Sequence, residues 1–88
     1  MIIVSQGKDE LVNFDRIESI WIGADEDGRV TIEATADTNS ILGTYSTEER
    51  AKEVLKEIIE AYRDYRTAEC DGYTNVLQET AVFEMPEE

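Results

Sequence analysis

The fold of this chain is decided by one stretch, Ser46-Thr47-Glu48-Glu49-Arg50-Ala51-Lys52-Glu53-Val54-Leu55-Lys56-Glu57-Ile58-Ile59-Glu60-Ala61-Tyr62. Its apolar side chains recur at the i, i+3, i+4, i+7, i+8 and i+11 positions of a single helical face. The residues on that face are Ala51, Val54, Leu55, Ile58, Ile59 and Tyr62. We therefore expect an amphipathic helix that continues to residue 65 and buries this face against a sheet.

The start of this helix carries a capping-box pattern. Ser46 precedes Glu49 by three residues, so the Ser46 hydroxyl is placed to accept the Glu49 N–H while the carboxylate reaches back. Glu48 and Glu49 also stand where the positive end of the helix dipole favours anions. The pattern predicts Ser46 as the N-cap.

The rest of the chain reads as short strands separated by turns. Alternating or β-branched runs predict strands at residues 1–5, 11–14, 17–22, 30–35, 41–45 and 81–85. Asp27-Gly28 is a hairpin signal, and 73–77 fits no single element. The order β-β-β-β-β-α-β predicts one α+β domain over residues 1–88, a small antiparallel sheet of about five to six strands packed on one long helix. Exposed edges in so small a sheet favour a homo-oligomer.

The net charge of −13 on 88 residues limits the classes of partner. Nucleic acids and anionic membranes are attracted by positive fields, so we expect neither as a partner. A basic protein partner remains compatible. The single Cys70 fits a reducing compartment, and we find neither a spanning apolar run nor a signal peptide. We expect a cytoplasmic protein.

Catalytic residues are scarce in the sequence. The absence of histidine removes the commonest general base and the usual activation of serine or cysteine nucleophiles. No glycine-rich phosphate loop is present. Asp25-Glu26-Asp27-Gly28 lacks the distal ligands of a calcium loop and reads as an acidic turn. We therefore expect no enzyme, no cofactor and no metal site.

Cations are few, so their grouping is informative. Arg63 and Arg66 stand three residues apart on the expected helix end, where they are able to hold an anion together. Tyrosines lie close to them in sequence, and aromatic rings beside arginine suit an adenine nucleotide. The candidate ligand-binding residues are Arg50, Arg63, Arg66, Tyr62, Tyr65 and Tyr73. The alternative is that these arginines pair with glutamates one turn away.

The acidic residues of the helix support a different hypothesis. Carboxylates spaced along a helix can imitate a phosphate backbone and occupy the nucleic-acid channel of a basic protein. The residues in this series are Glu48, Glu49, Glu53, Glu57, Glu60 and Asp64. A solvated helix face explains the same pattern.

Three segments resemble small phage and prophage proteins of Gram-positive bacteria. They are the start at residues 2–8 (Ile-Ile-Val-Ser-Gln-Gly-Lys), the helix start at 45–52 (Tyr-Ser-Thr-Glu-Glu-Arg-Ala-Lys) and the end at 82–88 (Val-Phe-Glu-Met-Pro-Glu-Glu). Those proteins share an ISQDG-like start, a Y-S-T-E-E-K-A helix start and an F-x-x-P end followed by acidic residues. Here Gly7-Lys8 replaces Asp-Gly, and residues 17–42 are outside the resemblance.

The same resemblance extends to the Thoeris anti-defence sponges. These are phage proteins that bind and sequester cyclic ADP-ribose-type signals without cleaving them, as dimers or larger assemblies. The resemblance implies a non-catalytic counter-defence protein that binds a nucleotide second messenger in the bacterial host. No binding residue is carried over from the family. The alternative function is an acidic inhibitor that blocks a basic host defence protein.

Overall fold

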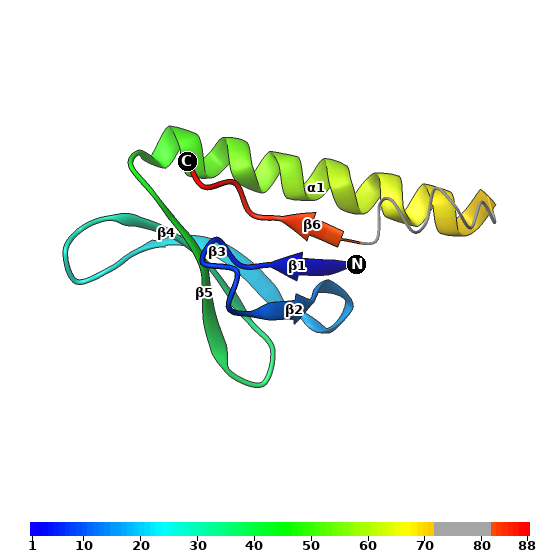
Figure 1. The fold of residues 1–88 in the computed structure, drawn as a ribbon, viewed down its shortest axis with the longest axis horizontal. Coiled ribbons are helices and arrows are strands. Elements are labelled where there is room, and N and C mark those ends of the chain that lie inside the picture. The colour runs from blue at the N-terminus through cyan, green and yellow to red at the C-terminus, as the bar shows by residue number, and fades with distance from the viewer. Residues whose placement is uncertain (72–81) are drawn as a thin grey trace.

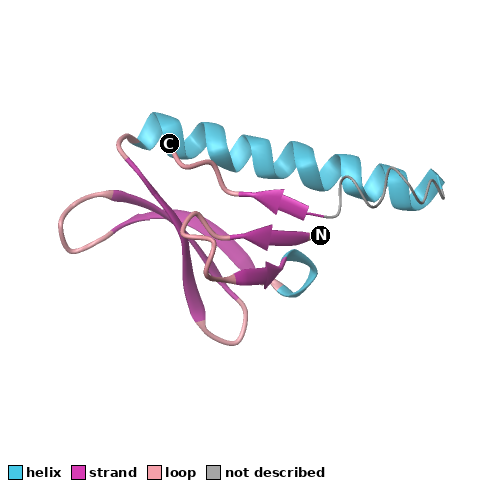
Figure 2. Cartoon of the chain, viewed as in Figure 1, coloured by secondary structure: helices cyan, strands magenta, loops and turns pink. Residues whose placement is uncertain are grey.

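The computed structural model shows an α+β fold with six strands and one long helix (Figures 1 and 2). It describes the backbone of residues 1–71 and 82–88 and the side chains of residues 1–66 and 82–88. The elements are β1 (Ile2–Val4), β2 (Leu11–Asn13), the 3-10 turn η1 (Phe14–Arg16), β3 (Ser19–Ala24), β4 (Val30–Thr35), β5 (Asn39–Tyr45), α1 (Glu48–Asp71) and β6 (Val82–Glu84). The expected order is confirmed, while residues 73–77 lie outside the described part.

The strands form two three-stranded sheets, which corrects the expected single antiparallel sheet. One sheet has the order β2-β1-β6 and the other has the order β3-β4-β5. β2 is three residues long and ends in the 3-10 turn η1, so the chain leaves the first sheet before β3 begins. β6 is parallel to β1, because α1 carries the chain back along the molecule before it enters the sheet beside β1 (Figure 1).

Helix α1 buries the predicted face, with one exception. Ala51, Val54 and Ile58 are at most 1% exposed, and the helix packs on β3, β4 and β5. Ile59 is 55% exposed, so its expected place in the core is wrong. At 3.6 residues per turn it lies about 80° around the helix from Ala51, beyond the edge of the buried stripe.

The helix cap also differs from the prediction. The helix begins at Glu48, so Thr47 is the N-cap, and its side-chain oxygen accepts the Arg50 N–H at 3.1 Å. Ser46 instead donates its hydroxyl to a carboxylate oxygen of Glu88 at 2.9 Å. A threonine cap satisfies one of the orphan N–H groups of the first turn equally well.

The core lies between the helix and the two sheets. Ile3, Val12 and Phe83 share one row across the first sheet and face this core. The second sheet contributes Ile32, Ala34 and Leu42, each at most 2% exposed. The buried core residues are Met1, Ile3, Ile32, Ala34, Leu42, Tyr45, Ala51, Val54, Ile58 and Met85.

The two sheets are joined by the main chain and side chain of Gln6. Its N–H donates to the Leu42 carbonyl at 2.7 Å, beside the irregularity in the β4–β5 register. Its side-chain amide donates to the Thr44 carbonyl at 2.9 Å and accepts the Thr44 N–H at 2.8 Å. The same amide nitrogen also donates to the carbonyls of Pro86 and Glu87. Gln6 therefore pairs with the main chain of β5 in the way that a neighbouring strand pairs with a sheet edge. It also holds the segment after β6 in place through hydrogen bonds to the carbonyls of Pro86 and Glu87.

Replacing Gln6 with leucine is expected to lower the free energy of unfolding by about 2–4 kcal/mol. The change keeps the bulk but leaves the main-chain groups of Thr44, Pro86 and Glu87 without this partner. Urea denaturation followed by circular dichroism measures the loss. Asn39→Ala, which removes one exposed side-chain hydrogen bond to Thr35, is the control and is expected to cost less than about 1 kcal/mol. Equal stability of the two variants contradicts the joining role of Gln6.

Candidate functional site

The structure divides the predicted ligand-binding residues between two places. Arg50 lies in the first turn of α1, whereas Arg63 and Arg66 lie in its C-terminal half. Arg63 follows Arg50 by thirteen positions along the helix, which corresponds to a rise of about 20 Å. Arg50 therefore does not share a site with the other two within this chain. Tyr73 lies outside the described residues.

Arg50 fastens the end of the described chain to the helix. Its guanidinium pairs with Glu53 at 3.1 Å and Glu57 at 3.4 Å, and donates to the Glu88 main-chain oxygen at 2.8 Å. Because glutamates three and seven residues away supply its partners, the pairing alternative raised from the sequence applies to Arg50. Its role in this structure is to position the segment after β6.

An aromatic cluster forms where η1 meets the C-terminal half of α1; it consists of Phe14, Tyr62 and Tyr65. The Tyr62 and Phe14 rings meet edge to face, with centroids 4.7 Å apart. The Tyr62 and Tyr65 rings are stacked, with centroids 6.1 Å apart and planes 27° from parallel. Tyr62 donates its hydroxyl to Asp15 at 3.2 Å, so the ring orientation is set from both sides.

Two arginines of this helix end directly follow the two tyrosines of the aromatic cluster in the sequence. Arg63 and Arg66 both have exposed side chains, and each is adjacent to a tyrosine of the aromatic cluster. Within the described part of the chain, no ion pair involves Arg63. The arrangement offers a ring surface with a neighbouring guanidinium, a combination that suits a base and a phosphate. The sequence analysis missed Phe14 and Asp15 because their contacts with Tyr62 join residues more than 45 positions apart.

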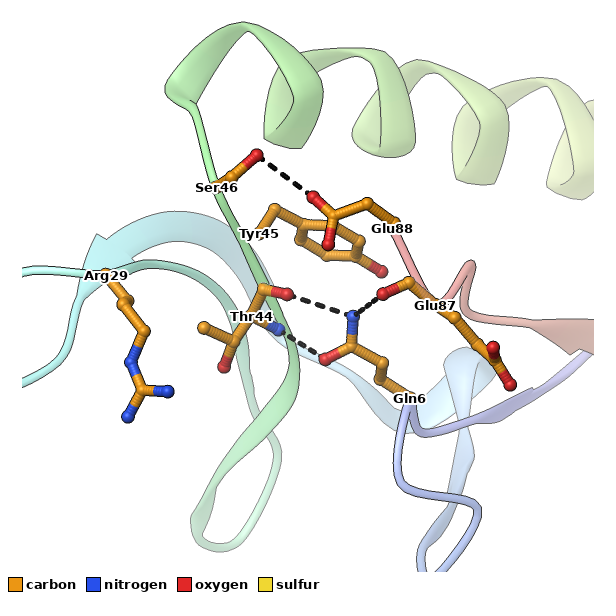
Figure 3. A pocket seen from close by; sticks show the side chains of 7 residues that line it. All are labelled: Gln6, Arg29, Thr44, Tyr45, Ser46, Glu87 and Glu88. Atoms are coloured by element: carbon orange, nitrogen blue, oxygen red, sulfur yellow. Dashed lines mark hydrogen bonds between the residues drawn. The ribbon is translucent and has the colours of Figure 1, made fainter.

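A polar pocket of about 570 Å³ lies at the opposite end of the helix (Figure 3). Its lining residues come from distant parts of the chain: Gln6, Arg29, Thr44, Tyr45, Ser46, Glu87 and Glu88. The Gln6 amide is occupied by the main-chain groups described above. Glu87 and Glu88 place two carboxylates at the pocket, and Arg29, its one lining cation, pairs with Asp25 and Asp27, so the pocket does not favour an anion.

Tyr45 anchors the floor of this pocket. Its side chain is 1% exposed and donates its hydroxyl to the Pro86 carbonyl at 2.7 Å. Burial raises the pKa of Tyr45 from 10.0 to about 12, against an opposing effect of the Arg50 charge. The phenol is therefore neutral at ordinary pH and acts as a structural donor.

The acidic turn before β4 is stabilised from within. One Asp25 oxygen accepts the N–H groups of Asp27 at 3.0 Å and Arg29 at 2.8 Å, and the Arg29 guanidinium pairs with both carboxylates. Gly28 adopts a φ of +82°, as the hairpin signal requires. Among the residues that the structure describes, no group of three or more acidic or cysteine side chains is arranged to hold a metal ion.

The acidic residues of α1 line its exposed surface. Glu48, Glu53 and Glu57 pair with Lys52 or Arg50. Glu49, Glu60 and Asp64 are exposed and form no ion pair within residues 1–66 and 82–88. Part of the expected acidic series is therefore engaged by cations of the same helix.

The three segments that carry the family resemblance meet at one place. Gln6 from the first, Tyr45, Ser46 and Arg50 from the second, and residues 86–88 from the third are joined by hydrogen bonds. The shared residues thus build the joint between the sheets, the helix start and the segment after β6. They lie away from the aromatic cluster.

Comparison with known proteins gives no match to a family model, a curated protein or a solved structure. In the described part of the chain, no helix has the length and apolar character needed to span a bilayer.

Replacing Tyr45 with phenylalanine is expected to change how stability depends on alkaline pH. Since the folded pKa is raised, the neutral phenol contributes stability that is fully present below pH 10 and is lost as pH rises through about 12. At pH 7 the variant lacks one buried hydrogen bond, so its free energy of unfolding is expected to be about 1 kcal/mol lower than that of the wild type. Above pH 10 its free energy of unfolding is expected to fall less steeply than that of the wild type. Urea titrations across this range measure both effects. Ser46→Ala is the control, and parallel declines in all three proteins contradict the assignment.

Proposed function

We propose that this protein is a non-catalytic, phage-type counter-defence protein that binds and sequesters a nucleotide second messenger of the cyclic ADP-ribose type. The observation that carries the proposal is the aromatic cluster flanked by exposed arginines on one helix end. The family resemblance of three chain segments supports the same function. A homo-oligomer is part of this proposal.

The proposed ligand contacts follow from the chemistry of the two groups. A purine base presents an apolar face, and the half-buried rings of Tyr62 and Tyr65 supply a matching surface. A diphosphate needs charge-assisted donors, which Arg63 and Arg66 provide. Tyr73 belongs to the same proposed set of ligand contacts. Arg50 is not part of this set, because it lies far from Arg63 and Arg66 and already contacts Glu53, Glu57 and the Glu88 carbonyl.

The negative net charge shapes where such a ligand is able to bind. A chain of −13 repels an anion at long range, and the pocket of Figure 3 adds two carboxylates. Arg63 and Arg66 lie far along the helix from that pocket. At physiological salt, screening limits the interaction between surface charges to about 8 Å, so a local site built on two arginines is compatible with the negative net charge of the whole chain.

Thermal unfolding with cyclic ADP-ribose or ADP-ribose tests the proposal. A ligand at 100 times its dissociation constant adds about 2.7 kcal/mol, which raises the melting temperature of so small a domain by about 10 °C or more. Arg63→Ala combined with Arg66→Ala is expected to abolish the shift. Arg29→Ala, which removes an exposed arginine from the acidic turn, is the matched control and is expected to keep it.

Release of the ligand separates sequestration from catalysis. A complex that is heated until the protein unfolds is expected to return the nucleotide unchanged by mass spectrometry. Recovery of a hydrolysed nucleotide contradicts the non-catalytic proposal. The absence of any shift with both ligands contradicts cyclic ADP-ribose-type binding.

A second candidate function is favoured by the unpaired carboxylates of the helix. Glu49, Glu60 and Asp64 leave an acidic surface available to a basic protein, such as one with a nucleic-acid channel. Under this alternative, competition for DNA measured with a basic DNA-binding protein is lost when these three residues are changed to lysine. The paired residues Glu53 and Glu57 are left intact, so Arg50 keeps its partners. An unaltered competition by the triple variant contradicts this function.

A further inference from the structure

The outer face of the β2-β1-β6 sheet carries an apolar surface that the proposed ligand site does not use. The strand register places Leu11, Val4 and Glu84 in one row, and Asn13, Ile2 and Val82 in the next. Side chains alternate along a strand, so both rows point away from the buried row of Ile3. We call these six residues the outer face.

Apolar side chains form a continuous diagonal across this outer face. Leu11 and Val82 occupy opposite corners and are 72% and 52% exposed. Ile2 and Val4 lie between them and are half-buried. None of the four belongs to the core or packs against it among the described residues. Four adjoining aliphatic side chains on one open face of a small domain mark an interaction surface.

The charges on this face are balanced, in contrast to the rest of the protein. Glu84 is the one charged residue in the two rows, and Lys8 pairs with it at 3.8 Å. The outer face is therefore neutral within a chain of −13. A basic partner is drawn to the acidic helix surface, so a neutral apolar face fits best against another neutral apolar face.

We propose that the outer face binds the same face of a second copy of this chain. A two-fold axis along the Asn13–Glu84 diagonal places Leu11 of each copy over Val82 of the other, with Ile2 over Val4. The contact is isologous, as closed dimers require. Glu84 of each copy lies on the axis beside its counterpart, and the Lys8 side chains of both copies lie next to this pair and balance its charge. Because a domain of this size buries a limited core of its own, association adds apolar burial that the monomer lacks.

The like charges of the two copies give this dimer a characteristic response to salt. Two chains of −13 repel one another, while the contact itself is apolar and neutral. Raising the salt concentration from about 0.05 M to about 0.5 M shortens the range of the repulsion severalfold. The dimer is therefore expected to become tighter with salt, whereas a complex with a basic protein becomes weaker.

Sedimentation equilibrium of the ligand-free protein over a range of concentrations and salt tests this assembly. The wild type is expected to form a dimer, and Leu11→Glu is expected to weaken it by about tenfold or more, since it removes a leucine that the contact covers and adds a charge. Ile59→Glu changes an equally apolar, exposed residue on the helix and is expected to leave the dissociation constant of the dimer within about twofold of the wild-type value. Circular dichroism establishes that each variant is folded.

A charge exchange tests the geometry independently of the apolar contacts. Lys8→Glu alone is expected to weaken the dimer, and Lys8→Glu with Glu84→Lys is expected to restore it. A wild type that stays monomeric at every salt concentration overturns the proposal. So does an Ile59→Glu variant that dissociates the dimer as strongly as Leu11→Glu, or an association that weakens with salt. Because no nucleotide is present, failure of the ligand proposal does not affect this result.

Discussion

The structure depends on the amide of one side chain, Gln6, which acts as a piece of backbone. A sheet edge presents unpaired N–H and C=O groups, and the edge of β5 next to its irregular register is completed by the Gln6 amide rather than by a strand. The same nitrogen holds two carbonyls beyond β6. Without this joint, the main chain of β5 has no hydrogen bond through Thr44 to the segment before β2.

Around that joint, the end of the described chain is fastened by groups of different kinds. Tyr45 supplies a neutral buried donor to Pro86, and Arg50 supplies a cation to the Glu88 oxygen. The burial that raises the pKa of Tyr45 also excludes water from its hydrogen bond.

The proposed ligand site is located away from this joint. The aromatic cluster joins η1 to the far half of α1, where Arg63 and Arg66 follow Tyr62 and Tyr65 in the sequence. The outer face of the first sheet is a third, separate surface. An acidic chain thus presents an aromatic cluster with two neighbouring arginines, an acidic helix surface that includes Glu60 and Asp64, and a neutral apolar face.

Local periodicity was enough to predict the helix and the approximate strand positions: apolar residues recur every three to four positions from Ala51 to Tyr62, and side chains alternate in β4. The end of the helix was predicted too early, since α1 runs to Asp71 rather than to residue 65. The sequence also indicated the Gly28 turn. The local pattern also predicted that Ile59 is buried and that Ser46 is the N-cap. In the structure Ile59 is exposed beside the buried Ile58, and the next residue, Thr47, is the N-cap.

The division into two sheets and the parallel pairing of β6 with β1 were set by the tertiary structure. It likewise brought Phe14 and Asp15 to Tyr62. These features rest on contacts between residues about 40 to 80 positions apart. Such contacts depend on how whole elements pack, which no local pattern of side chains specifies.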